Sequence, residues 1–188
     1  MIDRLCDQAE GKDVAVVGLY CDFLAQKEQS TANMLGAILK QLARRGEIPK
    51  DIQEAFRKAR ERIGGLGLQL SDQVEIMKKI IASLSQVFIC IDALDESTPQ
   101  HRQKLLQSLQ EIVRGSRNAR IFLTGRPHIE DEIMRSFRKV VRIRLSPTLD
   151  DIESYLEMRL SRDTDSYAMD DELRADIMRV IPEKTSKM

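Results

Sequence analysis

Apolar residues occur in two alternating patterns along the chain, short unbroken runs and longer stripes at helical spacing. The runs at 15–20, 87–91 and 119–124 predict strands, and the unbroken run at 87–91 indicates a strand that is buried on both faces. The stripes predict amphipathic helices, expected within 31–43, 52–63, 71–84 and 99–113. Strands that alternate with helices over the first 145 residues indicate βαβ units. The predicted fold class is therefore α/β, with a mostly parallel sheet flanked by helices.

The C-terminal part of the chain has a different pattern. A short acidic helix is expected around 129–137, and the segment 140–145 alternates Arg142 and Arg144 with apolar residues. This alternation predicts a strand with one solvated face near a sheet edge. Two further amphipathic helices follow Pro147 and extend to about Ile181. We therefore expect an α/β core over 1–146 and the start of a helical subdomain over 147–188.

Composition narrows the classes of partner. Basic and acidic residues number 30 each and there is no tryptophan, so neither nucleic acid nor an anionic membrane is favoured. The basic residues between Arg135 and Arg144 have no aromatic residues interleaved and indicate a solvated edge. No stretch approaches the ~20 apolar residues of a membrane span, and Met1–Lys12 carries no signal peptide. We expect a cytoplasmic protein whose cysteines are reduced, with no nucleic-acid or membrane partner.

Acidic residues gather at the end of the most apolar run. Asp92 ends this run, and Asp95 and Glu96 follow it. In open α/β sheets, ligands bind beyond the carboxyl ends of the strands. Carboxylates there suit Mg²⁺, which proteins hold with one or two carboxylates together with substrate phosphates. The pattern is typical of the Walker B strand of a nucleotide-hydrolysing protein. The alternative is a buried strand followed by a polar turn that caps the next helix.

A second candidate site follows the next strand. Thr124-Gly125-Arg126-Pro127 ends the run at 119–124, so it lies at a carboxyl edge too. A guanidinium at this point could contact a γ-phosphate through two hydrogen bonds. The alternative is that Arg126 pairs with a nearby carboxylate such as Glu96. His101 and His128 have no partner spacing typical of a metal site or a catalytic triad.

The two strand ends together resemble the NACHT domain of STAND-class signalling ATPases. The residues that carry the resemblance are Phe88–Glu96 followed by Ile121–Pro127, and Tyr20–Phe23, Gln26–Thr31 and Leu145–Ile152 resemble the fungal NOD-like receptors of this group. The resemblance implies a three-layer P-loop NTPase fold and a cytoplasmic role in signal transduction. It also implies a switch that is closed with ADP and open, oligomerising, with ATP.

The resemblance also implies roles for individual residues. Asp92 would hold Mg²⁺ through water, as a metal and cofactor-binding residue, and Thr124 and Arg126 would be cofactor-binding, with Arg126 sensing the γ-phosphate. Asp95 and Glu96 would be catalytic, because they occupy the position that polarises the attacking water. The implied cofactors are ATP or ADP with Mg²⁺, and the implied partners are nucleotide, other receptor domains or further copies of the protein.

The sequence departs from this family at one essential point. No Gly-x-x-x-x-Gly-Lys-Ser/Thr loop occurs, although its backbone N–H groups and lysine supply most of the grip on phosphate. The Gly64–Gly67 stretch follows a predicted helix and precedes no Lys-Ser or Lys-Thr pair, so it indicates a linker. In the family, the strand before the loop lies between those expected here at 119–124 and 140–145. We therefore expect a partial NACHT core that lacks this strand. The sequence leaves open whether another segment, such as Met1 to Leu5, takes its place.

Three functions follow from these features. The first is part of a nucleotide-dependent signalling switch that neither binds nor hydrolyses ATP by itself. The second is a non-catalytic module for protein interaction or self-association, with a degenerate NTPase fold and unpaired strand edges. The third is a metal-dependent nuclease that uses the same acids.

Overall fold

The structure is a computed structural model, and its two compact units are described separately. The units are Met1–Val140 and Val141–Met188. The residues that the structure describes are 2–9, 13–44, 50, 53, 54, 57, 58, 61, 68–162 and 170–185. The helix expected within 52–63 and the linker at Gly64–Gly67 lie largely or wholly outside these residues. Within the described part of the chain, no helix is long and apolar enough to cross a membrane.

The first unit is built on a sheet of three parallel strands. The strands are β1 (Val14–Tyr20), β2 (Gln86–Asp92) and β3 (Ala119–Leu123), in the order β1-β2-β3. β1 and β2 pair along their whole length, from Val14 opposite Gln86 to Tyr20 opposite Asp92. β3 pairs with β2 from Ala119, which lies opposite Val87. The apolar runs in the sequence predict these three strands to within one or two residues of their bounds. The α/β class and the parallel sheet are confirmed.

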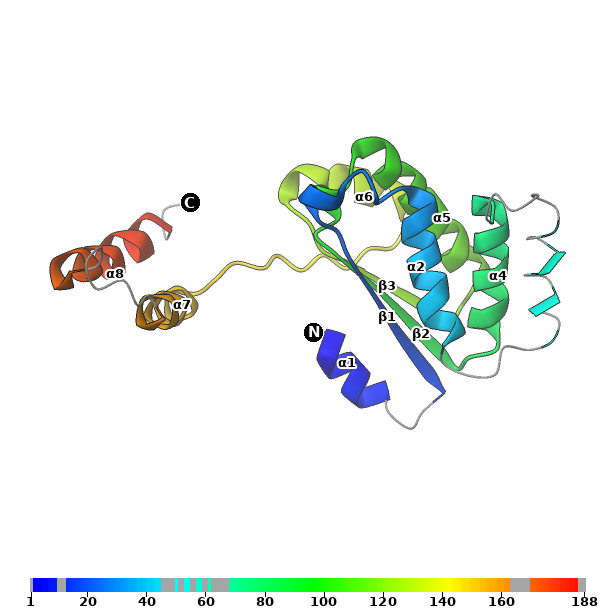
Figure 1. Cartoon of the computed structure of the whole chain (residues 1–188), viewed down its shortest axis with the longest axis horizontal. Helices are drawn as coiled ribbons and strands as arrows, with labels where there is room; N and C mark the ends of the chain where they lie inside the picture. Colours follow the sequence, from blue (N-terminus) through cyan, green and yellow to red (C-terminus); the bar gives the residue numbers. More distant parts are fainter. Residues whose placement is uncertain are drawn as a thin grey trace. The chain divides into compact units, whose positions relative to one another are not determined.

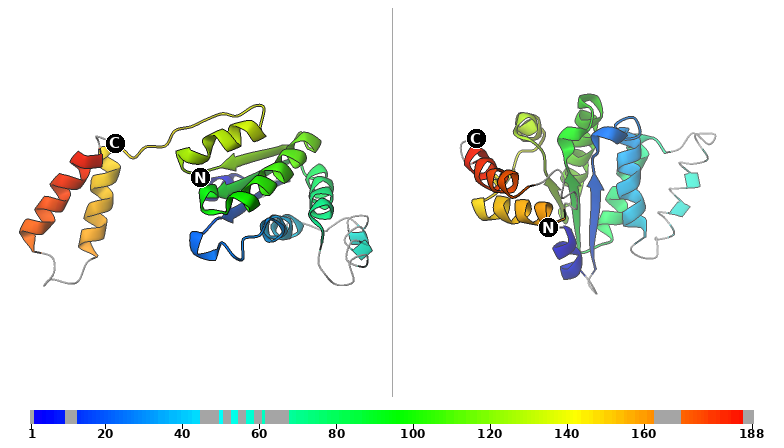
Figure 2. Two further views of the ribbon diagram at one scale, coloured as in Figure 1. Left: turned by 90° about the horizontal axis from the view of Figure 1, so that it is seen from above. Right: turned by 60° about the vertical axis from the view of Figure 1, so that its left-hand side comes forward.

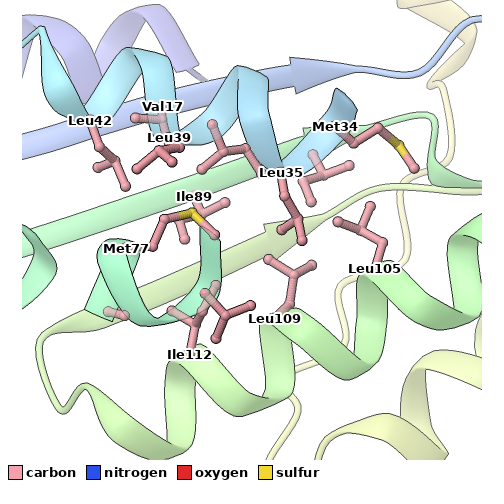
Figure 3. Packing of buried hydrophobic residues seen from close by; sticks show 14 of the residues in the cluster. Val17, Met34, Leu35, Leu39, Leu42, Met77, Ile89, Leu105, Leu109 and Ile112 are labelled. Carbon is pink, nitrogen blue, oxygen red and sulfur yellow. The ribbon is translucent and has the colours of Figure 1, made fainter. Parts of the chain in front are cut away.

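Three helices cover one face of this sheet. They are α2 (Thr31–Ala43), α4 (Leu70–Ala82) and α5 (Pro99–Gly115), seen on the same side in Figures 1 and 2. Figure 3 shows how their apolar side chains meet those of the strands, with Leu35 of α2 and Leu109 of α5 near Ile89 of β2. Each of these three residues is completely buried. Burial of large aliphatic side chains supplies most of the free energy that holds such layers together.

A fourth helix, α1 (Ile2–Ala9), packs on the opposite face and makes the sheet the middle of three layers. Ala9 lies in a small cluster with Val16 and Cys90, against which Leu5 and Cys6 also pack. Sequence patterning did not lead us to expect this helix. Residues 2–5, which the sequence left open as a replacement for the missing strand, belong to α1. The three cysteines are not joined by disulfides, as expected.

The segment 140–148 is not a strand, and the prediction of a strand at 140–145 is wrong. It follows α6 (Glu130–Ser136), which the short 3-10 turn η3 (Pro127–Ile129) precedes. Its apolar side chains are exposed, Val141 by 89%, Ile143 by 74% and Leu145 by 83%. The alternating sequence suits a strand, but a strand also requires a neighbour for its backbone hydrogen bonds, and this segment has none in the described chain.

The second unit contains α7 (Leu149–Ser161) and α8 (Asp171–Thr185), which pack on each other. Thr148 and Asp151 form a reciprocal capping box at the start of α7. Leu156 and Leu160 are the buried residues of this helix. Both helices were expected from the spacing of apolar residues after Pro147.

Candidate functional site

The carboxyl ends of β2 and β3 lie side by side, and their connection continues beyond the strands. The backbone N–H of Thr124 donates to the carbonyl of Ile91 at 3.0 Å, and the N–H of Leu94 donates to the carbonyl of Thr124, also at 3.0 Å. The turn after β2 is a short 3-10 helix, η2 (Leu94–Glu96). These bonds bring the two predicted strand-end sites together as one group of side chains.

Asp92 and Thr124 are in direct contact. The hydroxyl of Thr124 donates a hydrogen bond to Oδ1 of Asp92 and accepts one from the N–H of Ala93 at 3.0 Å. Ala93 has a φ of 53°, in the left-handed region that residues with a Cβ seldom occupy. This strained turn directs the chain from the end of β2 into η2. Thr124 therefore orients the Asp92 carboxylate.

Arg126 lies against both of the following acids. Its backbone N–H donates to Oδ1 of Asp95 at 3.2 Å, its Nε lies 3.4 Å from Oδ2 of Asp95, and its Nη2 lies 3.3 Å from Oε1 of Glu96. The Arg126 side chain is 73% exposed, whereas that of Asp95 is only 6% exposed. The structure thus shows the carboxylate pairing that was the alternative for Arg126. Glu96 is the more accessible of the two acids, and the catalytic and sensor roles stay predictions.

Gly125 allows the Arg126 loop to pass close to the protein. A Cβ at Gly125 would lie 2.6 Å from Cδ1 of Ile129 and 3.4 Å from Oδ1 of Asp95. Ile129 is buried, so it has little freedom to move away. A glycine at this position is therefore a steric requirement of the site.

Two residues that sequence reasoning missed hold the acidic turn in place. Gln26 donates through Nε2 to the carbonyl of Glu96 at 2.6 Å, which connects the loop after β1 to η2. Arg102 of α5 is buried and donates to Glu132 of α6 and to the carbonyl of Ser97, each at 2.8 Å. Arg102 stands three and four positions before Leu105 and Leu106, on the apolar stripe of α5, and a cation at such a position is a sequence signal for a buried ion pair.

The negative charge of the site acts on a neighbouring thiol. Cys21 follows β1, and its N–H donates to the carbonyl of Asp92 at 3.0 Å. Burial, together with the nearby charges of Asp92, Asp95 and Glu96, raises the pKa of the Cys21 thiol to about 11. The thiol is therefore protonated at neutral pH and is not an activated nucleophile.

The donor groups fit a metal that is shared with a ligand. Among the described residues, no group of three His, Cys, Asp or Glu side chains is arranged to hold a metal ion. Asp92 alone, half-buried and oriented by Thr124, matches the single carboxylate that Mg²⁺ takes when phosphates and water complete its shell. A cavity of about 320 Å³ lies elsewhere, along the C-terminal half of α2 and the start of α4.

Comparisons with known proteins agree with the fold. No curated protein matches the chain. The solved structure of the Orc1 protein of Aeropyrum pernix in complex with DNA is similar, with a TM-score of 0.54 and 18% sequence identity. The match covers 99% of this chain and 50% of that one, so the chain spans half the length of that protein. The Walker-type ATPase PABY2304 of Pyrococcus abyssi has a TM-score of 0.42 and 11% identity over 86% of this chain and 58% of that one.

The fold is thus α/β and P-loop-NTPase-like, with a parallel sheet between layers of helices. One family model also matches, over residues 1–126, and its description is nephrocystin 3, N-terminal. The matched region includes all three strands and both strand-end groups up to Arg126. The chain belongs to the nephrocystin 3 N-terminal family.

Proposed function

We propose that this chain is part of a nucleotide-dependent signalling switch of the NACHT type. By itself, the chain does not bind ATP tightly and does not hydrolyse it. The observation that carries the proposal is the joining of two strand ends: Asp92 held by Thr124, beside Arg126 held by Asp95 and Glu96. Both groups lie at the carboxyl edge of a parallel sheet, where nucleotides bind in folds of this class. The P-loop-NTPase-like fold supports this placement.

Each residue has a distinct part in the proposed switch. Asp92 would hold Mg²⁺, which when bound neutralises phosphate charge. Thr124 keeps the carboxylate of Asp92 directed towards the edge. Arg126 is exposed and held by two ion pairs, so a phosphate with equally good geometry can compete for its guanidinium. Glu96 would then be released to orient a water molecule. Asp95, being buried and bonded to the Arg126 backbone, would keep the Arg126 loop in position.

The expected lack of tight binding has a physical cause. A phosphate-binding loop supplies most of the N–H donors that hold a nucleotide, and the sequence contains no such loop. One carboxylate and one arginine remain, which suffice only for weak contact with a polyphosphate. The resemblance to NACHT domains places the loop's strand next to β3, so the complete site would need that strand as well.

Calorimetry and NMR together test the proposal. Titration of the purified chain with ATP or ADP and Mg²⁺ should give no micromolar binding. At millimolar nucleotide, backbone amide shifts should change weakly and only near Asp92, Thr124 and Arg126, and Asp92→Asn should remove the part that depends on Mg²⁺. Arg120→Gln is the matched control, because Arg120 lies on β3 away from the carboxyl edge of the sheet. Micromolar, Mg²⁺-dependent binding that Asp92→Asn abolishes would contradict the proposal that the chain does not bind ATP tightly. Amide shifts away from Asp92, Thr124 and Arg126 would contradict the proposed position of the nucleotide site.

A second candidate function is a non-catalytic self-association module. It is favoured by the exposed apolar residues of 141–145. In this case the strand-end group is structural, and it connects the loops of the sheet without a ligand.

A further inference from the structure

Two of the three cysteines meet in the small cluster on the second face of the sheet. Cys90 of β2 is buried there with Ala9 and Val16, and Cys6 of α1 packs against this cluster while remaining partly exposed. Cys21 belongs instead to the main core. The fold therefore separates one cysteine from the other two, which come from segments far apart in the sequence.

Small residues surround this pair. Gly18 lies opposite Cys90 in the ladder between β1 and β2, so β1 places no side chain beside Cys90 at that position. Ala9 follows Cys6 by three positions and lies on the same face of α1, and it is only 3% exposed. Because interiors are close-packed, a helix that meets a sheet through such small side chains lies close to it. The two thiols are therefore not separated by a bulky residue of either position.

The two thiols also interact electrostatically. Burial raises the pKa of the Cys90 thiol, and the negative charge that Cys6 carries as a thiolate raises it further. A single charge has such an effect only at short range, so the two sulfur atoms are neighbours. Cys90 is protonated at neutral pH, and an external reagent reaches the more exposed Cys6 first.

We propose that Cys6 and Cys90 form a reversible disulfide that joins α1 to β2 under oxidising conditions. The oxidant is a low-molecular-weight disulfide such as oxidised glutathione. The thiolate of Cys6 attacks one sulfur of this disulfide, whose S–S bond breaks and releases one glutathione thiolate. The thiolate of Cys90 then attacks the Cys6 sulfur of the mixed disulfide, and the second glutathione leaves. The two cysteines lose two protons and two electrons, which reduce the oxidant to two thiols.

The bond acts close to the candidate site. Cys90 stands two positions before Asp92 on β2, and alternate residues of a strand share a face, so the bond holds α1 on the face of the sheet to which Asp92 belongs. It also closes a long loop of the chain, which stabilises the folded state relative to the unfolded one. The proposal depends on neither nucleotide nor Mg²⁺, so its failure leaves the proposed switch untouched.

Equilibration of the full chain in buffers of reduced and oxidised glutathione tests the proposal. After acid quenching, unfolding and alkylation of the remaining thiols, mass spectrometry of the digested protein should find the Cys6 and Cys90 peptides linked and Cys21 alkylated. Excess reductant should reverse the link. The oxidised chain should unfold on heating at a midpoint about 5 °C or more above that of the reduced chain.

Variants identify the two partners. Cys6→Ser should abolish both the internal disulfide and the rise in the unfolding midpoint, and Cys90→Ala should do the same. Cys21→Ser is the matched control and should retain both, because Cys21 lies in the main core. A folded chain that only carries glutathione on Cys6, or that stays fully reduced in the oxidising buffer, would overturn the proposal. An internal disulfide that persists in Cys6→Ser would overturn it as well.

Discussion

The contact between Thr124 and Asp92 is the most specific interaction of the site at the scale of single residues. Thr124→Val keeps the shape of the side chain but removes both hydrogen bonds, and it leaves the Ala93 N–H and the carboxylate without these partners. We expect a loss of about 1–3 kcal/mol in the free energy of unfolding, measured by urea denaturation. Thr124→Ser keeps the hydroxyl and should lose much less. Equal stability of the two variants would show that the hydroxyl contributes nothing.

Gly125 gives a second prediction at this scale. Gly125→Ala should destabilise the chain by about 1–3 kcal/mol, because the new Cβ would overlap Ile129 in a buried position. Ile129→Val removes the Cδ1 atom that lies closest to the new Cβ. The double variant should therefore be more stable than the sum of the two single changes predicts, which thermal unfolding of all four proteins can measure. Simple additivity would exclude the steric explanation.

Cys21 makes the stability depend on alkaline pH. Its pKa is raised from 9.0 to about 11 in the folded chain, so the unfolded chain loses the thiol proton first as the pH rises. The stabilising contribution is fully present below pH 9.0 and is lost as the pH passes through about 11. Cys21→Ser, which does not titrate, should lose less stability over this interval. Urea denaturation at a series of pH values checks this, and parallel curves for the two proteins would refute it.

At the scale of elements, the contact of Gln41 on α2 with Gly18 on β1 is open to a direct test. Gln41 Oε1 accepts from the Gly18 N–H at 3.0 Å, and Gln41 Nε2 donates to the Gly18 carbonyl at 2.7 Å. Gln41→Ala would leave the Gly18 N–H and carbonyl without their partners. We expect a loss of about 1–3 kcal/mol in the free energy of unfolding and faster hydrogen exchange at Gly18. Lys40→Ala, at the exposed position of α2 directly before Gln41, should change neither quantity. Unchanged exchange at Gly18 in Gln41→Ala would show that β1 does not need this contact.

The elements that sequence patterning predicted are those whose burial is local and regular. The strand β2 was recognisable because both of its faces are covered, which leaves the unbroken apolar run 87–91. The segment 140–145 misled the prediction because alternation reports strand propensity and does not report whether an edge is available. The helix α1 was missed although Leu5, Cys6 and Ala9 have helical spacing, since two turns give a weak periodic signal.

The candidate site was predictable in its residues and not in its contacts. Parallel strands place their carboxyl ends together, so Asp92 and Arg126 could be assigned to one edge from the order of elements alone. The sequence could not show that Thr124 is engaged by Asp92, or that Asp95 is buried under Arg126, because these contacts depend on the turn at Ala93. The parts played by Gln26 and Arg102 depend on packing between distant segments in the same way.

At the scale of the whole molecule, the division into two units predicts where the described chain is most easily cut. Residues 138–148 lie outside any helix or strand and are exposed, and they include Arg138, Lys139 and Arg144. Within the described residues, we expect trypsin to cleave first in this segment, as mass spectrometry of a brief digest would show. Early cleavage inside α2 or α5 instead would contradict the division.

The contact of Gln41 with Gly18 has a consequence for how this sheet can join another. A fibril grows because every strand that is added presents a fresh edge to the next molecule. In this sheet Gln41 occupies the outward N–H and carbonyl of Gly18, so a strand that joins the β1 edge would have to displace this side chain. The same glutamine that satisfies the backbone of Gly18 therefore opposes the addition of strands along β1.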